Sequence, residues 1–213
     1  MVLLRLSPWT TRAATRSMQA AIGGILLVGL WTRNIAVVVN AVLALAVTFL
    51  PAILERDWNL PLDAGLTLWI TTAVLLHTVG MLGLYGTVWW WDHLTHTLSA
   101  TIVAGVGYAT ARAIDEHTDA VAFPPRFLFV YVILFTLALG VLWEVLEFAV
   151  HGLSGYFGVD AVLVQYSLED TIVDLVFDLV GAILVALFGT TTLRSVVDTL
   201  TTRLAGGSSD ELR

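Results

Sequence analysis

The chain has 213 residues and a net charge of −7, and 58% of its residues are hydrophobic while only 13% are charged. In soluble domains about a quarter of all residues are charged. The low charge of this chain therefore excludes an ordinary soluble domain and predicts an all-α integral membrane protein. The sequence contains no cysteine, which excludes disulfides and thiolate metal sites. The basic residues are ten dispersed arginines, so nothing in the sequence points to a nucleic-acid partner.

Six apolar segments follow one another along the chain, each close to the roughly 17–25 residues that cross a bilayer. The predicted spans are 14–31, 35–54, 64–84, 93–113, 127–150 and 171–188. We therefore expect a six-helix transmembrane bundle within residues 14–190. Residues 1–13 would form a cytoplasmic or interfacial segment. Residues 191–213 would form a cytoplasmic tail that begins with a short helix on the inner interface.

The placement of the arginines predicts the orientation of these spans. If the N-terminus is cytoplasmic, Arg33 is the only arginine on the outer side. The other nine then lie inside, at positions 5, 12, 16, 56, 112, 126, 194, 203 and 213. Cytoplasmic loops of membrane proteins carry such an excess of basic residues. We expect a multi-pass protein of the plasma membrane, in contact with membrane lipids, with both termini in the cytoplasm.

Clusters of ionisable side chains stand at the outer ends of the last three spans. They are Asp92, His93 and His96; then Glu144, Glu147 and His151; then Asp170, Asp174 and Asp178. Residues three and four apart share one face of a helix, so each cluster forms a stripe. An aspartate at the centre of a span costs at least ~2.5 kcal/mol. The sequence therefore predicts one shared polar site, built from three helices.

Imidazole together with carboxylate suits Zn, Fe or Mn, and carboxylate alone suits Mg. A divalent metal would also offset the charge of several neighbouring acids. The predicted metal ligands are His93, His96, Glu144 and Asp174. The predicted general base is Glu147 or Asp178. The remaining members of the polar site are Asp92, His151 and Asp170.

Other chemistries fit the same residues. A histidine–carboxylate pair can move a proton without metal, acids and histidines within spans can conduct ions or protons, and polar pairs can simply join helices. The spans contain almost no polar path toward the cytoplasm, which favours a pocket open to one side. We predict a metal-dependent enzyme acting on a lipid or isoprenoid-linked substrate at the outer leaflet. The alternatives are a proton- or cation-coupled carrier and a non-enzymatic scaffold subunit.

Isolated polar residues in the spans receive simpler interpretations. His77 is expected to be a core histidine with a local partner, and Asn40 an interhelical hydrogen-bonding group. The aromatic run Trp89–Trp91, with Tyr85 just upstream, is typical of an interfacial belt. Gly140 is expected to allow close helix packing.

Three motifs carry a resemblance to a known family: Trp90–Ser99, Trp143–Phe148 and Asp170–Ala182. In order and spacing they resemble the YjdF-like family of small multi-spanning membrane proteins and, more distantly, the VanZ-like proteins. The resemblance implies a six-helix topology and a shared polar site. That site would centre on Asp92, His96, Glu144, Glu147, Asp174 and Asp178. Ala100 departs from the family pattern, which has glycine there.

Overall fold

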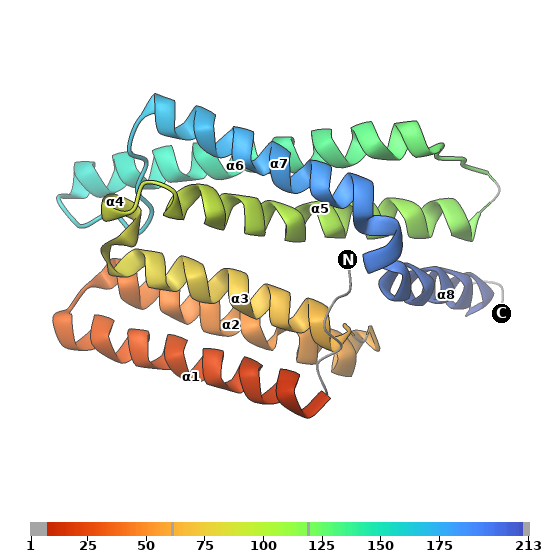
Figure 1. Cartoon of the computed structure of the whole chain (residues 1–213), viewed down its shortest axis with the longest axis horizontal. Coiled ribbons are helices and arrows are strands. Elements are labelled where there is room, and N and C mark those ends of the chain that lie inside the picture. Colours follow the sequence, from red (N-terminus) through yellow and green to blue (C-terminus); the bar gives the residue numbers. More distant parts are fainter. Residues whose placement is uncertain (1–7, 61, 119, 211–213) are drawn as a thin grey trace. The chain divides into compact units, whose positions relative to one another are not determined.

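The structure, a computed structural model, describes residues 8–60, 62–118 and 120–210. Residues 1–7 of the predicted N-terminal segment and residues 211–213 of the tail lie outside it. The elements are α1 (Pro8–Thr32), α2 (Ile35–Trp58), α3 (Ala64–Val79), the π-helix η1 (Gly80–Leu84), α4 (Tyr85–Thr87), α5 (Trp91–His117), α6 (Pro125–Phe157), α7 (Leu168–Thr192) and α8 (Arg194–Asp210) (Figure 1). Across these described ranges every regular element is helical, which confirms the all-α class.

Five stretches are long and apolar enough to cross a membrane: α1, α2, α3 continued through α4, α6 and α7. The fourth predicted span is α5, whose 27 residues exceed the required length. Its first two turns, however, contain Asp92, His93 and His96 among several threonines, and these lower its hydropathy. Length and composition thus support five of the six predicted spans directly.

The chain divides into two compact units, and α5 and α6 each contribute to both. The first unit comprises residues 1–95 and 148–164, and the second comprises 96–147 and 165–213. In the first unit α1, α2 and α3 lie side by side (Figure 1). Ile22 on α1 packs with Ala41 and Ala44 on α2 in its core. The Gln19 amide also donates to Thr48 Oγ1 at 3.1 Å, which joins α1 to α2.

The third predicted span is interrupted, which the sequence analysis did not anticipate. After Val79 the chain forms the π-helix η1, in which Gly83 has φ +115°, and then the short helix α4. Glycine takes positive φ at little cost because it lacks a Cβ. The interruption turns Tyr85 back toward α3, where its hydroxyl lies 2.7 Å from His77 Nδ1.

In the second unit, close approach of the helices depends on glycines. A Cβ on Gly181 of α7 would stand 2.6 Å from the Thr97 carbonyl oxygen and 2.7 Å from Ala100 Cβ, both on α5. A Cβ on Gly107 of α5 would meet the Phe135 ring of α6 at 2.5 Å. Ala100 is thus a small residue packed directly against Gly181, so the departure from the family pattern does not prevent contact between α5 and α7.

The last two long helices extend beyond the predicted bounds. Helix α6 continues from its predicted end at Val150 through Phe157. Helix α7 begins at Leu168 rather than Thr171, because the Ser167 side chain accepts a hydrogen bond from the Asp170 backbone N–H. Such a capping interaction satisfies one of the free donors at a helix start, and it extends the helix N-terminal to the apolar run.

We expect Gly181→Ala to destabilise the protein by about 1–3 kcal/mol, the usual cost of overpacking a close contact. The contact partner is a backbone oxygen, which cannot move aside as a flexible side chain does. Gly23→Ala on α1 is the matched control, because its added Cβ meets nothing within 4 Å. Thermal unfolding in detergent would compare the two variants. A Gly181→Ala protein as stable as the control would contradict the close α5–α7 packing.

Candidate functional site

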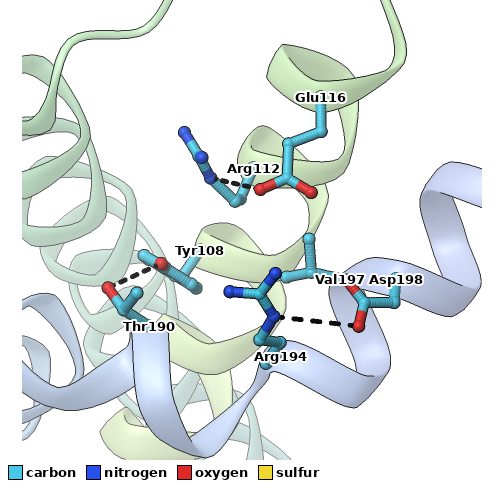
Figure 2. A pocket seen from close by; sticks show the side chains of 7 residues that line it. All are labelled: Tyr108, Arg112, Glu116, Thr190, Arg194, Val197 and Asp198. Carbon is cyan, nitrogen blue, oxygen red and sulfur yellow. Dashed lines mark hydrogen bonds and ion pairs between the residues drawn. The ribbon is translucent and has the colours of Figure 1, made fainter.

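The second unit has a small pocket of about 50 Å³ between α5, α7 and α8. Figure 2 shows its lining residues: Tyr108, Arg112, Glu116, Thr190, Arg194, Val197 and Asp198. Both arginines are paired with acids, Arg112 with Glu116 at 2.8 Å and Arg194 with Asp198 at 3.9 Å. Arg112 also pairs with Asp115. The pocket therefore offers no unmatched positive charge for an anion, and its polar groups satisfy one another.

A different cluster in the second unit joins the predicted site residues of α5 and α7. His96 of α5 lies between two aspartates of α7, with Nδ1 3.2 Å from Asp178 Oδ1 and Nε2 3.9 Å from Asp174 Oδ2. Asp174 and Asp178 are 2% and 5% exposed. They are four residues apart, so α7 presents both carboxyl groups on one face. The structure thus confirms the predicted convergence of these three residues.

The two contacts of His96 differ in length, so the two aspartates relate to the imidazole in different ways. An ionised carboxylate only accepts hydrogen bonds, so with Asp178 ionised the 3.2 Å contact requires that His96 Nδ1–H donates to it. A neutral imidazole then carries a lone pair on Nε2, the nitrogen that faces Asp174. The 3.9 Å separation is too long for a hydrogen bond. It leaves space for a cation bound to both atoms, since zinc–ligand bonds are about 2.0–2.2 Å.

Glu144 of α6 also belongs to this cluster, which thus draws on three helices: α5, α6 and α7. Its side chain is 5% exposed, and its Oε1 atom is buried with no hydrogen-bond partner in the described parts of the chain. Its carboxyl group has Thr171 of α7 as a hydrogen-bond partner and lies close enough to His96 and Asp178 for direct charge interaction. A buried carboxylate oxygen without a partner is costly, and a bound cation would satisfy it.

Thr171 and Gln165 support Glu144, and the sequence analysis did not identify either. The Gln165 amide donates to Thr171 Oγ1 at 3.0 Å, which leaves the threonine hydrogen for the Glu144 carboxylate. Thr171 could have been identified from the sequence, because it lies three residues before Asp174 and therefore on the same face of α7. Gln165 lies before α7, so helical spacing could not reveal it.

Gly140 has a specific role in this cluster. A Cβ at this position of α6 would lie 2.3 Å from Asp178 Oδ2. The predicted close packing at Gly140 is therefore confirmed, and the group it admits is the carboxylate that holds His96. Any larger residue at position 140 would push Asp178 away from the imidazole.

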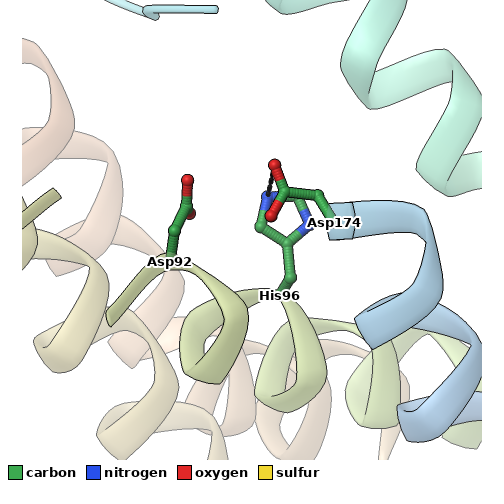
Figure 3. Close-up of side chains that lie close together, drawn as sticks. All are labelled: Asp92, His96 and Asp174. Carbon is green, nitrogen blue, oxygen red and sulfur yellow. Dashed lines mark ion pairs between the residues drawn. The ribbon is translucent and has the colours of Figure 1, made fainter. Parts of the chain in front are cut away.

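Figure 3 shows the side chains of Asp92, His96 and Asp174. Asp92 lies one turn before His96 on the continuous helix α5, and a carboxylate oxygen of Asp92 comes within 4.8 Å of a ring nitrogen of His96. Asp92 itself belongs to the first unit.

The other predicted site residues have different surroundings. His93 belongs to the first unit, where its ring stands edge-on to Trp89 at 6.1 Å between ring centroids. His151 is exposed and also belongs to the first unit. Glu147 is half-buried at the end of the second unit's part of α6. Asp170 lies in the first turn of α7 and interacts electrostatically with Glu144. The proposed roles of these four residues stay predictions.

A family profile described as a predicted membrane protein (DUF2238) matches residues 14–195. The chain belongs to this family. The YjdF-like resemblance is thereby confirmed, because the YjdF-like proteins are the family that this profile describes. The VanZ-like resemblance is not shown by these matches. The matched range contains His96, Glu144, Asp174 and Asp178.

One relative of the chain comes from Thermotoga maritima and is named "Uncharacterized protein". It is 27% identical over 140 residues, which cover 62% of this chain and 66% of the relative. No solved structure matches the chain. The comparisons establish membership of a membrane-protein family and bring no reaction with them, so the chemistry must be argued from the side chains.

We expect Asp178→Leu to destabilise the metal-free protein by about 1–3 kcal/mol, because His96 Nδ1–H would lose its buried acceptor. Asp178→Asn keeps an oxygen that can accept this hydrogen bond and should cost less. Thermal unfolding in the presence of a chelator would measure both. Equal losses for the two variants would mean that the contact between His96 and Asp178 contributes nothing as a hydrogen bond.

Proposed function

We propose that this family member is a membrane-embedded, divalent-metal-dependent enzyme with its site at the outer face of the bilayer. The observation that carries the proposal is the His96 imidazole, oriented by Asp178 and facing the buried Asp174 across 3.9 Å. The proposed ligands within the second unit are His96 Nε2, Asp174 and Glu144. Asp178 is the orienting carboxylate, in the arrangement by which metal-binding histidines are commonly held.

Electrostatics support a cation in this cluster. Glu144, Asp174 and Asp178 are buried, and Arg112 and Arg194 of the same unit are already paired with other acids. Three ionised carboxylates in a low-dielectric environment repel one another strongly. A divalent ion bound to Asp174 and Glu144 would offset two of these charges. The mixed imidazole and carboxylate donors favour Zn, Mn or Fe over Mg.

The substrate class follows from where such a site would stand. A cluster within membrane-spanning helices is reached by molecules that partition into the bilayer, which favours a lipid or an isoprenoid-linked substrate. The metal would supply a Lewis acid or an activated water, and Glu147 is the proposed general base. Mass spectrometry of lipid extracts incubated with purified protein, with and without metal, would search for the product.

The orientation requires that α5 crosses the membrane as the sixth span. With α5 as a span, nine arginines lie inside and one outside. Without it, and with the N-terminus inside, only Arg5, Arg12, Arg16 and Arg56 remain inside and six lie outside. The positive-inside rule favours the first arrangement. At 1.5 Å per residue, 27 residues reach about 40 Å, enough to cross ~30 Å of hydrocarbon.

Cysteine labelling tests this topology. Because the sequence contains no cysteine, each introduced cysteine is the only one that the reagent can label. We expect Gly158→Cys to react with an impermeant maleimide in intact cells. Thr118→Cys and Ser208→Cys should react only after permeabilisation. Labelling of Thr118→Cys in intact cells would mean that α5 does not cross, and the proposed outer site would then lose its basis.

Metal binding is tested on the purified protein. We expect bound divalent metal and a loss of thermal stability on chelation; a site occupied at a hundredfold its Kd adds about 2.7 kcal/mol. Asp174→Asn should abolish most of this metal-dependent shift. Glu144→Gln should cost little without metal, because a neutral amide resembles a carboxyl group, and should reduce the shift with metal. Asp198→Asn on α8, whose side chain is 59% exposed, is the matched control and should retain the full shift.

Two results would count against the metal centre. The first is protein purified without chelator that contains no divalent metal and shows no stability change on its addition. The second is an equal metal-dependent shift in wild type, Asp174→Asn and Asp198→Asn, which would place any bound ion elsewhere.

A further inference from the structure

A second polar network lies in the first unit and takes no part in the proposed metal site. It begins at Asn40 on α2, continues through His77 on α3 and Tyr85 on α4, and ends at Thr95 and Asp92 on α5. The successive distances are 3.0 Å from Asn40 Oδ1 to His77 Nε2, 2.7 Å from His77 Nδ1 to Tyr85 Oη, 3.4 Å from Tyr85 Oη to Thr95 Oγ1, and 3.4 Å from Thr95 Oγ1 to Asp92 Oδ1. These contacts confirm the expected local partner of His77 and the interhelical bond of Asn40.

Asn40 determines which nitrogen of His77 can change its protonation. The Asn40 amide nitrogen donates to the Ala36 and Val162 carbonyl oxygens, each at 2.9 Å. Both of its hydrogens are thus used, and the atom that faces His77 is an acceptor. His77 Nε2 must carry a hydrogen whether the ring is neutral or charged. A proton can therefore enter or leave only at Nδ1, the nitrogen that faces Tyr85.

The backbone is shaped to bring Tyr85 to this nitrogen. Eight residues of uninterrupted α-helix would separate Tyr85 from His77 by about 12 Å along the axis. The π-helix η1 and Gly83 at φ +115° close this distance. A Cβ on Gly80 would lie 2.5 Å from the Tyr85 ring and 2.8 Å from Trp91 Nε1. Gly80 and Gly83 thus make the contact possible, and π-helical turns are frequent at functional sites.

His77 Nδ1 and Thr95 Oγ1 can each accept the hydroxyl hydrogen of Tyr85, and the charge of His77 selects between these two. When His77 is neutral, Tyr85 donates to Nδ1. When Nδ1 is protonated it donates to Tyr85, whose own hydrogen can then turn toward Thr95 Oγ1. The Thr95 hydroxyl can in turn donate to Asp92, either to the carbonyl oxygen at 2.9 Å or to the carboxylate. The direction of the whole chain therefore follows the charge of one imidazole.

We propose that Thr95, Tyr85 and His77 form a proton relay, oriented by Asn40, with His77 Nδ1 as its proton-accepting atom. Its ligand is a proton, received at Thr95 from water or a protonated acid at the outer end of α5. That donor gives a proton to Thr95 Oγ1, the Thr95 hydroxyl proton passes to Tyr85, and the Tyr85 proton passes to Nδ1. The donor loses one proton, His77 gains one, and no electrons move. The relay does not depend on metal binding.

Charged groups on the elements packed against α3 stand well away from His77. Met18 of α1 is level with Thr72, so Arg16 lies about 10 Å from His77 along the axis. On α2, Glu55 is fifteen residues from Asn40, or about 22 Å. Arg33 and Asp160 are exposed. Within the network, Asp92 is thus the charged group to which the chain of hydroxyls leads.

The first test uses the wild-type protein in lipid nanodiscs and needs no variant to fold. The chain has five histidines, so ¹⁵N-labelled imidazoles can be assigned by single His→Gln substitutions. We expect neutral His77 to carry its hydrogen on Nε2 and to gain a second on Nδ1 as the pH falls. A neutral His77 with its hydrogen on Nδ1, or a ring that never gains a proton before the protein unfolds, would overturn the proposal.

The second test breaks the relay away from His77. At the midpoint of the His77 titration, the widths of its ring resonances report the rate of proton exchange. We expect Thr95→Val to slow this exchange about tenfold or more, as an increase in the barrier by one hydrogen bond's net free energy would. The Nε2–H tautomer should be unchanged. Thr78→Val is the matched control, because this buried threonine neighbours His77 but donates to its own helix at Val74.

Tyr85→Phe should slow the exchange in the same way. Its matched control is Tyr108→Phe, which removes a tyrosine–threonine hydrogen bond of 3.0 Å in the second unit. Unchanged exchange in Thr95→Val and Tyr85→Phe would show that His77 gains its proton by another route. Equal slowing in the relay variants and their controls would show a general packing effect. Either result would overturn the relay.

Discussion

Hydrocarbon offers no hydrogen-bond partner, so a polar group within a membrane-spanning helix is costly unless the protein, or a ligand bound to it, supplies a partner. The distribution of side chains in both units follows from this constraint. Large apolar residues such as Leu43, Leu134 and Leu142 remain 58–61% exposed, while Thr71, Thr136 and Asp174 are almost fully buried. The polar side chains therefore supply much of the packing specificity. In a soluble protein apolar side chains would fill that role.

Hydrogen bonds of about 3 Å between side chains also require that the helices approach closely. Glycine is the means of that approach at each polar cluster. Gly140 admits the Asp178 carboxylate to the surface of α6, and Gly80 admits the Tyr85 ring to the end of α3. Gly181 brings α7 against the backbone of α5. Mutations at these glycines should thus affect the polar sites through geometry, even though a glycine contributes no chemical group.

The sequence predicted the residue types and the faces of the sites better than it predicted the roles of individual groups. Helical spacing placed Asp174 and Asp178 on one face of a helix. From this the convergence of both residues with His96 could be predicted. It could not show which aspartate lies within hydrogen-bond distance of His96, because that depends on the rotation of α5 about its axis. Thr171 and Gln165 escaped notice because neutral side chains are common at helix starts.

The interruption after Val79 was missed for a different reason. Gly80 and Gly83 lie in an apolar run, and a glycine in such a run usually indicates close packing. Only the backbone reveals a residue at φ +115°, and only the resulting fold reveals that Tyr85 contacts His77. The aromatic run was interpreted as an interfacial belt. This interpretation suits the exposed Trp89 and Trp90, but Trp91 donates to the Leu76 carbonyl oxygen at 3.2 Å inside the first unit.

The low hydropathy of α5 follows from the same constraint. Consecutive residues of an α-helix point about 100° apart, so Thr95 and His96 face different surroundings although they are neighbours in sequence. Thr95 has its partners in the first unit, and His96 has Asp174 and Asp178 in the second. A polar side chain that has partners within the protein need not be matched to hydrocarbon, so α5 need not be apolar at these positions. The low hydropathy of the start of α5 thus corresponds to the hydrogen bonds and ion pairs that Thr95 and His96 make.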